Sequence, residues 1–421
     1  MSGRSVDSAA RTKRESAPSL YQLLDPAVLA DPYPLYRRLR EHGRVHWDPF
    51  LHAWVVTGYQ EVVTVLHKFS ADRTPTPEQL DAMGLGALAP IAQVMVKQML
   101  FMDAPAHTRL RGLCAAAFTS RRIEHLRAQI EDIADHLIDR VIASGRMDVV
   151  GDFASPLPAM VTARMLGVPV EDHAQLKAWS ADFAEMLGNF QHNPDRAAGV
   201  LRSVEAMTAY FRAALEDIRR QPREGLIHAL MTAEVDGGRL TDEEVIANSI
   251  VTMVGGQETT TNLIGNGLLT LLRQPAALAR LRDDPSIIEP AVEELLRYES
   301  PSQHTGRIAP DDVVLGGQRI RKRDAVMAVM AAANRDPDRF PDPDRLDLTR
   351  TDNRHLAFGW AAHFCFGAPL ARMEGQIAFA TLLRRLRDLA LEPVPLTWRE
   401  NLGLRGLTAL PVRFAPGPAG A

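Results

Sequence analysis

"HLAFGWAAHFCFGAPLAR", residues 355–372, contains Cys365, one of only two cysteines in a chain of 421 residues. Three phenylalanines lie close to this cysteine in the sequence, and a Gly-Ala-Pro turn opens a predicted helix directly after it. The N-terminus of a helix favours a thiolate over a thiol. Gly367 lets the backbone come close and leaves its N–H free to donate to the sulfur. The stretch therefore predicts a cysteine thiolate sheltered by aromatic rings.

Other roles are open to a lone cysteine. Most are inert core residues, which is what we expect of Cys114 in "GLCAAAF". A nucleophilic cysteine needs a histidine base, and His363 is close, but a cluster of phenylalanines is a poor site for polar acyl chemistry. Zinc needs ligands at paired spacings, which the sequence around Cys365 lacks. A thiolate that ligates one open position of a haem iron needs no second protein ligand, so it fits best.

Composition limits the class of protein. The chain is 46% hydrophobic with a formal net charge of -4, so it is globular and carries no overall basic field for nucleic acid. No apolar run approaches the ~18–20 residues needed to span a bilayer. Two cysteines suit a reducing compartment. We expect a cytoplasmic protein without a membrane segment, with a flexible tail over residues 1–20 and a single domain over residues 21–421.

Helical periodicity dominates the chain, and the predicted fold class is mainly α with a small β region. Residues 71–92 are expected to form a loop region, and the segment 333–350, rich in Pro and Asp, an ordered meander. Helices are predicted at 34–43, 59–69, 106–118, 121–143, 152–166, 172–190, 196–220 and 241–273. Strands are predicted at 44–48 and 53–58, within 306–330, and at 404–414.

The predicted helix over 241–273 is the longest, about 50 Å at 1.5 Å per residue. It opens at Thr241 with Glu244 three residues later, which is a capping box. Its centre contains Gly255 and Gly256, each costing roughly 1 kcal/mol relative to Ala. Such a centre is either a packed kink with solvated polar groups or a groove where a flat group approaches the backbone.

Glu258 and Thr259 follow these glycines in an otherwise apolar helix. Burying such polar groups costs free energy, so we expect them to serve a function. We therefore favour the groove, in which Glu258 and Thr259 serve chemistry.

Two helical pairs and one arginine complete the set of candidate residues. Glu294 and Arg297 are spaced i, i+3, and His107 and Arg111 are spaced i, i+4, so each pair shares a helix face. Either pair alone would be an ordinary surface feature. Together with Arg307 they could clamp carboxylates, for instance the propionates of a haem.

Five segments resemble the cytochrome P450 family, and they occur along the chain in the same order as in the family. "FGWAAHFCFGAPLAR" is similar to the family's haem-binding signature F-G-x-G-x-H-x-C-x-G, and "VGGQETT" is similar to its central-helix motif. "EELLR" matches its E-x-x-R motif, and "AHTRLR" and "NRDPDRFPDPDRLDLTR" resemble its bacterial members. The resemblance covers roughly residues 25–415. It implies a triangular, mostly helical prism whose long central helix lies over a haem.

The resemblance implies a role for each candidate residue. It makes Cys365 the axial thiolate ligand of haem b, shielded by Phe358 and approached by Gly367. It implies that four basic side chains hold the haem propionates: His107, Arg111, Arg307 and His363. It implies a buried ion-pair lock behind the haem loop: Glu294, Arg297 and Arg345. It implies that the central helix flanks the site of the co-substrate O2, with Gly255 and Gly256 near the oxygen pocket. There Thr259 would steady dioxygen and Glu258 would relay protons.

Ala361 departs from the family pattern, which has glycine at this place. That glycine usually adopts a turn conformation that is costly for a residue with a Cβ. We expect a modest adjustment of the loop that moves Trp360, with haem still bound. Phe366, bulkier than the usual aliphatic residue, is expected to tune the iron potential through packing.

The function implied by the resemblance is that of a haem-thiolate monooxygenase. It would hydroxylate or epoxidise a fairly large apolar small molecule, such as a polyketide or macrolide-like metabolite of antibiotic biosynthesis. Electrons would come from a ferredoxin and its reductase, and the protein would be a monomer. Two alternatives use the same cofactor: oxidative coupling, ring closure or desaturation, and a non-catalytic haem protein. A thiol hydrolase is a further alternative.

The segments that line the substrate pocket by resemblance are chemically mixed. Their apolar members suit a large irregular ligand, although plain core packing explains methionines equally well: Met83, Met95, Met99, Met253 and Leu407. Their polar members are Ser302, Gln303 and His304. Three arginines are candidates for a basic patch that docks an acidic ferredoxin: Arg121, Arg122 and Arg372.

Overall fold

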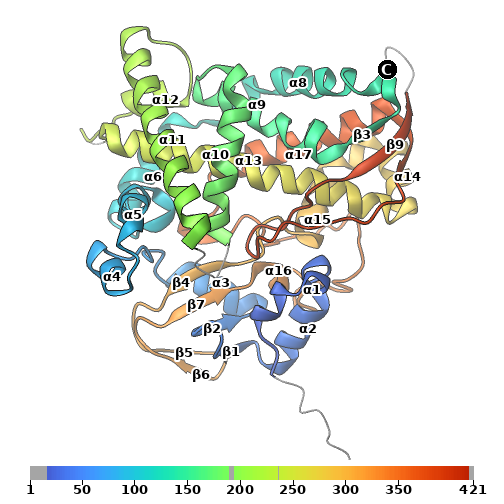
Figure 1. Ribbon diagram of the computed structural model, residues 1–421. Helices are drawn as coiled ribbons and strands as arrows, with labels where there is room; N and C mark the ends of the chain where they lie inside the picture. Colours follow the sequence, from blue (N-terminus) through green and yellow to red (C-terminus); the bar gives the residue numbers. More distant parts are fainter. Residues whose placement is uncertain (1–16, 189–193, 236, 417–421) are drawn as a thin grey trace, which may run out of the picture.

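The computed structural model describes residues 17–188, 194–235 and 237–416. Helices form one large layer, and a four-stranded sheet with the N-terminal helices lies along its lower side in Figure 1. The helices are α1 Pro26–Ala30, α2 Tyr33–His42, α3 Tyr59–Lys68, α4 Pro77–Ala82, α5 Ala89–Met95, α6 Ala106–Ala117, α7 Ser120–His125, α8 Arg127–Asp139, α9 Pro156–Leu166, α10 His173–Gly188, α11 Pro194–Arg220, α12 Leu226–Thr232, α13 Asp242–Leu272, α14 Pro275–Asp283, α15 Ile288–Tyr298, α16 Met330–Ala333 and α17 Ala368–Arg385. The predicted class, mainly α with a small β region, is confirmed.

The strands form three small sheets. Their bounds are β1 Val45–Asp48, β2 Ala53–Val56, β3 Arg146–Asp148, β4 Thr305–Ile308, β5 Val313–Leu315, β6 Gln318–Ile320, β7 Ala325–Ala328, β8 Leu386–Leu391 and β9 Pro411–Pro416. The main sheet has the order β1-β2-β7-β4, in which β2 and β7 run parallel and the outer pairs run antiparallel. The predicted Gly-Gly turn joins β5 to β6, with Gly316 and Gly317 both at positive φ. The main sheet thus pairs Arg307, on β4, with Val326 of β7, and β7 in turn runs beside β2 from the start of the chain.

The central helix α13 begins where the capping box predicts. The Thr241 side chain accepts from the Glu244 N–H, and the Glu244 side chain accepts from the Thr241 N–H. The helix is continuous through the two central glycines, and it packs against α9, α10 and α11 as well as α17. Most of its side chains are buried because neighbouring helices surround it. The helix therefore crosses the interior of the molecule.

Several local predictions differ from the structure. The tail predicted for residues 1–20 lies outside the described residues up to residue 16, but its end is packed: Leu20 is fully buried, and Ser19 donates to Asp48. The helix predicted over 121–143 is divided into α7 and α8, which meet at Leu126. The loop predicted over 71–92 contains α4, whose Thr76 forms a capping box with Gln79. A buried polar contact holds the start of the described chain and a polar cap starts α4, and apolar periodicity records neither of them.

No helix in the described part of the chain has an apolar stretch that would cross a bilayer. The apolar residues instead face the interior, where the main cluster of buried side chains surrounds α13. This helix and α17, which starts after Cys365, pack against each other.

Two glycines of α13 differ in the space beside them, and this yields a test of the packing. A Cβ at Gly267 would lie 2.6 Å from Cζ of Phe379 on α17, whereas a Cβ at Gly265 would lie 3.5 Å from Val150. We expect Gly267→Ala to lower the free energy of unfolding by about 1–2 kcal/mol, because overpacking outweighs the helix propensity of Ala. The matched control Gly265→Ala should be neutral or stabilising. Urea unfolding followed by circular dichroism measures both, and equal effects would contradict the packing argument.

Candidate active site

The loop that carries Cys365 is held by its own backbone. The N–H of Cys365 donates to the carbonyl of Phe358 over 2.7 Å, and α17 begins three residues after the cysteine. Gly359 and Ala361 both adopt positive φ, at 72° and 57°, which lets the chain fold back on itself. Ala361 therefore adopts a left-handed conformation, which is costly for a residue with a Cβ.

The Cys365 sulfur has a mixed environment. Burial raises the pKa of the Cys365 thiol, while the Gly367 N–H and the charges of Arg111 and Arg372 oppose that rise. The side chain is nevertheless partly accessible, so it lines an interior space rather than solid core. A coordinated metal cation would deprotonate such a thiol outright. Cys114, in contrast, is buried in the core, and burial raises its pKa to about 12, as expected of an inert thiol.

The four basic residues predicted to hold propionates gather beside the Cys365 loop. Arg111 donates to the carbonyl of Phe364 over 2.7 Å. The rings of His107 and His363 have their centroids 4.2 Å apart. Burial and the positive neighbours His107 and Arg307 lower the pKa of His363 to about 4. These side chains crowd together although they repel one another when charged, so the cluster favours an anion.

Arg73 joins this cluster, and the sequence had given no sign of it. Burial and the charge of Arg307 lower the pKa of Arg73 to about 9. Its guanidinium donates to two backbone carbonyls, those of Ala71 and Leu100. Asp103 is the carboxylate that influences both arginines. Arg73 lies just before a Pro-rich segment without periodicity, so only the fold, which pairs this region with β4 through Ser70, reveals its position.

Polar atoms of the cluster remain without partners. Within the described residues, the buried Nε2 of His107 and the buried Nε of Arg307 have no hydrogen-bond partner. Buried donors and cations without partners are costly. The two carboxylates of a haem would satisfy them, so the residues present fit this cofactor.

The donor set around Cys365 points the same way. No group of three or more His, Cys, Asp or Glu side chains that could hold a metal ion occurs in the part of the chain that the structure describes. A metal at Cys365 must therefore bring most of its own ligands, as the iron of a porphyrin does.

The centre of α13 offers open space. Gly255 is exposed although it lies midway along an interior helix, and nothing lies within 4 Å of a Cβ built on it. Gly256 instead packs against Thr162 of α9, whose Oγ1 would lie 3.1 Å from such a Cβ. The hydroxyl of Thr259 donates to the carbonyl of Gly255 over 2.7 Å. The space thus lies on the face of Gly255, where a flat group can approach the helix.

Glu258 of the central helix is held by two basic side chains. Its side chain is only 3% exposed, and it is paired with Lys177 of α10 and with Arg399, whose Nη1 lies 2.6 Å from Oε2. Neither partner was anticipated from the sequence, because both lie far away along the chain. Glu258 therefore ties the central helix to α10 and to the C-terminal segment.

The predicted ion-pair lock is present, but Arg350 and not Arg345 is its third member. Glu294 and Arg297 are fully buried and form a two-pronged ion pair, at 2.8 Å for each bond. The third member is Arg350, whose Nε lies 3.2 Å from Glu294. The prediction of Arg345 was wrong: a turn after Asp342 carries its side chain outward, where it pairs with Asp347.

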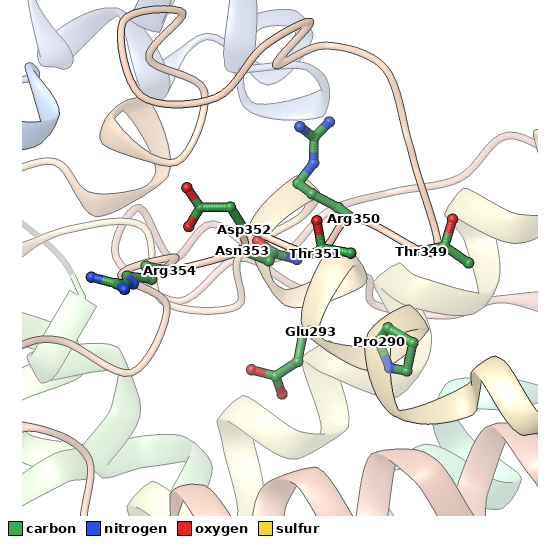
Figure 2. A pocket seen from close by; sticks show the side chains of 8 residues that line it. All are labelled: Pro290, Glu293, Thr349, Arg350, Thr351, Asp352, Asn353 and Arg354. Atoms are coloured by element: carbon green, nitrogen blue, oxygen red, sulfur yellow. The ribbon is translucent and has the colours of Figure 1, made fainter.

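A surface hollow lies next to the lock. It has a volume of about 740 Å³ and is lined by Pro290, Glu293, Thr349, Arg350, Thr351, Asp352, Asn353 and Arg354. Figure 2 shows that the side chains of Glu293 and Arg350 extend away from each other. None of the candidate catalytic residues lines it, so it is separate from the interior space beside Gly255.

The predicted pocket residues divide into two groups. The Gln303 side chain is engaged within the protein, because its oxygen accepts from the Tyr36 hydroxyl and its nitrogen donates to the Ser300 carbonyl. Burial lowers the pKa of His304 to about 4. Met253 is fully buried on α13, whereas Met83 is 55% exposed. Residues 183–195, which the resemblance also predicts to line the pocket, lie partly outside the described residues.

Comparison with known proteins identifies relatives over nearly the whole chain. A family model described as Cytochrome P450 matches residues 55–401. The chain is 41% identical to the cytochrome P450 monooxygenase PikC of Streptomyces venezuelae, covering 92% of each protein. It is 37% identical to the polyketide biosynthesis cytochrome P450 PksS of Bacillus subtilis, covering 91% of this chain and 96% of the relative. Among solved structures, one match is the crystal structure of P450BioI in complex with a hexadec-9Z-enoic acid ligated acyl carrier protein, with a TM-score of 0.87. It is 38% identical to this chain, and the match covers 92% of this chain and 100% of that chain.

The strained backbone at Ala361 yields a direct test. We expect Ala361→Gly to raise the free energy of unfolding by about 0.5–1 kcal/mol, because relief of the left-handed conformation outweighs the added freedom of the unfolded chain. The neighbour Ala362, which is also exposed and is not at positive φ, provides the control: Ala362→Gly should be destabilising. Urea unfolding of the two variants measures this, and a loss of stability at both positions would show that Ala361 is not strained.

Proposed function

The chain belongs to the cytochrome P450 family, and we propose that it hydroxylates or epoxidises a fairly large apolar secondary metabolite. It is a P450 monooxygenase, and its family uses haem b and O2. We further propose that residues 21–421 form one catalytic domain, active as a monomer in the cytoplasm.

The basic cluster beside Cys365, in which His107 and Arg307 are buried, is the observation that carries the proposal. Its members repel one another and leave donors unpaired, so an anionic cofactor with two carboxylates accounts for both facts. In the proposed arrangement Cys365 ligates the iron, and five basic side chains hold the propionates: Arg73, His107, Arg111, Arg307 and His363. Haem b ligated by the Cys365 thiolate would supply the iron chemistry that activates O2.

Thr259 and Glu258, at the centre of α13, are proposed to handle protons. The Thr259 hydroxyl donates to the Gly255 carbonyl, so its oxygen is left to accept a hydrogen bond from a water or ligand in the open space. Glu258 is fully paired with Lys177 and Arg399. It can take part in proton transfer only when one of these pairs exchanges with water, so movements of α10 or of the C-terminal segment would control its availability.

A large apolar substrate is supported by the relatives and by the side chains near α13. PksS is named for polyketide biosynthesis, and P450BioI was crystallised with a fatty acid carried on a protein. Met99, Met253 and Leu407 are buried apolar residues in the segments proposed to line the pocket. We therefore propose a polyketide or macrolide-like metabolite of antibiotic biosynthesis as the substrate.

A ferredoxin and its reductase are the proposed electron donors. Arg121 and Arg122 are exposed at the start of α7 and remain candidates for docking an acidic partner. Arg372 is less suited to this role, because its guanidinium is engaged by Glu293.

The two cysteines allow a matched test of the cofactor site. On reduction with carbon monoxide, the haem-loaded protein should absorb near 450 nm. Cys365→Ser should abolish this band, because serine is a poor thiolate substitute, whereas Cys114→Ser should retain it. Loss of the band in the Cys114 variant alone, or its absence from the unmodified protein with full haem, would contradict ligation by Cys365.

Two threonines of α13 test the proposed oxygen chemistry. Thr259 and Thr261 make the same bond to the carbonyl four residues earlier, but Thr261 is buried on another face. With a substrate identified by its shift of the Soret band, Thr259→Ala should lower product formed per reductant consumed by roughly tenfold, the size of one general acid–base contribution or less. Thr261→Ala should leave this ratio unchanged. An unchanged ratio in the Thr259 variant would remove Thr259 from the mechanism.

A further inference from the structure

Glu293 connects the helix of the lock with the helix that follows Cys365. It lies on α15 beside Glu294, and its carboxylate accepts two bonds from Arg372 of α17, at 2.7 and 2.8 Å. The Nε2 of His355 lies 3.2 Å from the same carboxylate. Burial by itself would raise the pKa of Glu293, but the bonds from Arg372 and His355 lower it to about 2.

The His355 ring is fixed in one tautomer by its second bond. The N–H of Ala357 donates to Nδ1 of His355 over 3.2 Å, so Nδ1 carries no proton. The proton of the neutral ring therefore sits on Nε2 and is donated to Glu293. His355 is thus held at both ring nitrogens, and its side chain is nearly buried, at 2% exposed.

Both partners of Glu293 contact Phe358. The guanidinium carbon of Arg372 lies 4.6 Å from the centroid of the Phe358 ring, and the His355 ring centroid lies 5.9 Å from it. The carbonyl of Phe358 in turn accepts from the Cys365 N–H. A continuous set of contacts thus runs from Glu293 through Arg372 and Phe358 to Cys365.

Arg372 also brings positive charge to the Cys365 loop through its contact with the Phe358 ring. Arg111 brings a second positive charge, because it donates to the carbonyl of Phe364 in the same loop. Glu293 compensates part of the Arg372 charge, because its carboxylate accepts two hydrogen bonds from the guanidinium. The ion pair is only partly buried, with side chains 32% and 27% exposed, so its effect on neighbours is moderate.

We infer that Glu293 is a positioning residue that sets the electron-donor strength of Cys365 by holding Arg372 and His355 against Phe358. The inference rests on the proposed function, in which Cys365 ligates the haem iron. Reduction adds an electron to the iron site, so a nearby positive charge favours the reduced state and a negative charge opposes it. The ion pair holds these opposing influences close to balance.

Removing the charge of Glu293 and removing that of Arg372 should therefore shift the reduction potential in opposite directions. In Glu293→Gln the charge of Arg372 is no longer compensated, and the reduction potential of the haem-loaded protein should rise. In Arg372→Gln the charge of Glu293 is left alone, and the potential should fall. Each change should be on the order of threefold in the reduction equilibrium, which is about 30 mV at 59 mV per tenfold for one electron. The double variant should return close to the unmodified protein.

Asp352 supplies a matched control. It lines the same surface hollow as Glu293 (Figure 2) but pairs with Arg339, and its side chain is 69% exposed. Asp352→Asn removes one negative charge from this hollow without touching the network, so its potential should shift by much less. Spectroelectrochemical titration of the full-length, haem-loaded proteins measures all four variants.

Shifts of the same sign in both single variants, or a shift in Asp352→Asn as large as that in Glu293→Gln, would overturn the inference. Arg372→Lys is the substitute test if a glutamine variant fails to hold haem. Because lysine keeps the positive charge, the reduction potential should shift by less than half of the shift expected for complete removal of the charge. A threefold change in the reduction equilibrium of Arg372→Lys would count against the network. The carbon monoxide band separates the two proposals. A 450 nm band with unchanged potentials removes the role of Glu293 alone, and its absence from the unmodified protein removes the ligation by Cys365.

Discussion

The buried ion pair between Glu294 and Arg297 is the constraint on which the segment leading to the Cys365 loop depends. Both side chains are fully excluded from solvent, and a buried charge without its partner costs several kcal/mol. Arg297 also donates to the carbonyls of Asn334, Pro343 and Arg345, and Glu294 accepts from the N–H of Asp347. The irregular segment between β7 and the Cys365 loop is thus pinned to α15 by charges that must remain satisfied. Its lack of regular structure is no sign of freedom.

The cofactor side of the molecule shows the opposite situation, in which charges are not satisfied internally. The pKa of Arg73 falls to about 9 and that of Arg307 to about 10, in both cases first of all through burial, and the nearby Asp103 also serves the backbone of Ala71. A protein that gathers cations in this way gains stability from any anion that binds only the folded state. The lock holds the loop in place by internal pairing, whereas the basic cluster is completed by a ligand. The two sets of charges therefore have different physical roles, although both consist mainly of arginine and carboxylate chemistry.

Much of this arrangement follows from the sequence, and the exceptions share one cause. The capping box at Thr241 and the i, i+3 pair on α15 are local patterns, and the structure contains both. Arg350 takes the place expected for Arg345 because the outcome depends on a turn in an aperiodic segment, which no periodicity encodes. Lys177 and Arg73 reach the site only through long-range packing, as partner of Glu258 and as neighbour of Arg307. Sequence patterns thus identify residues whose partners are one helical turn away, and they miss those whose partners arrive from another element.

The adjacent residues Glu293 and Glu294 show how one helix serves two different requirements. Successive positions on a helix point about 100° apart, so they cannot share a partner on one side. Glu294 faces inward to the lock, and Glu293 faces α17, where it meets Arg372 beside the Phe358 ring. A displacement of α15 would therefore disturb the irregular segment and the Cys365 loop together. Since the loop is held at its other end by α17, which packs on α13, the geometry at the sulfur is coupled to the position of two helices rather than to the loop sequence alone.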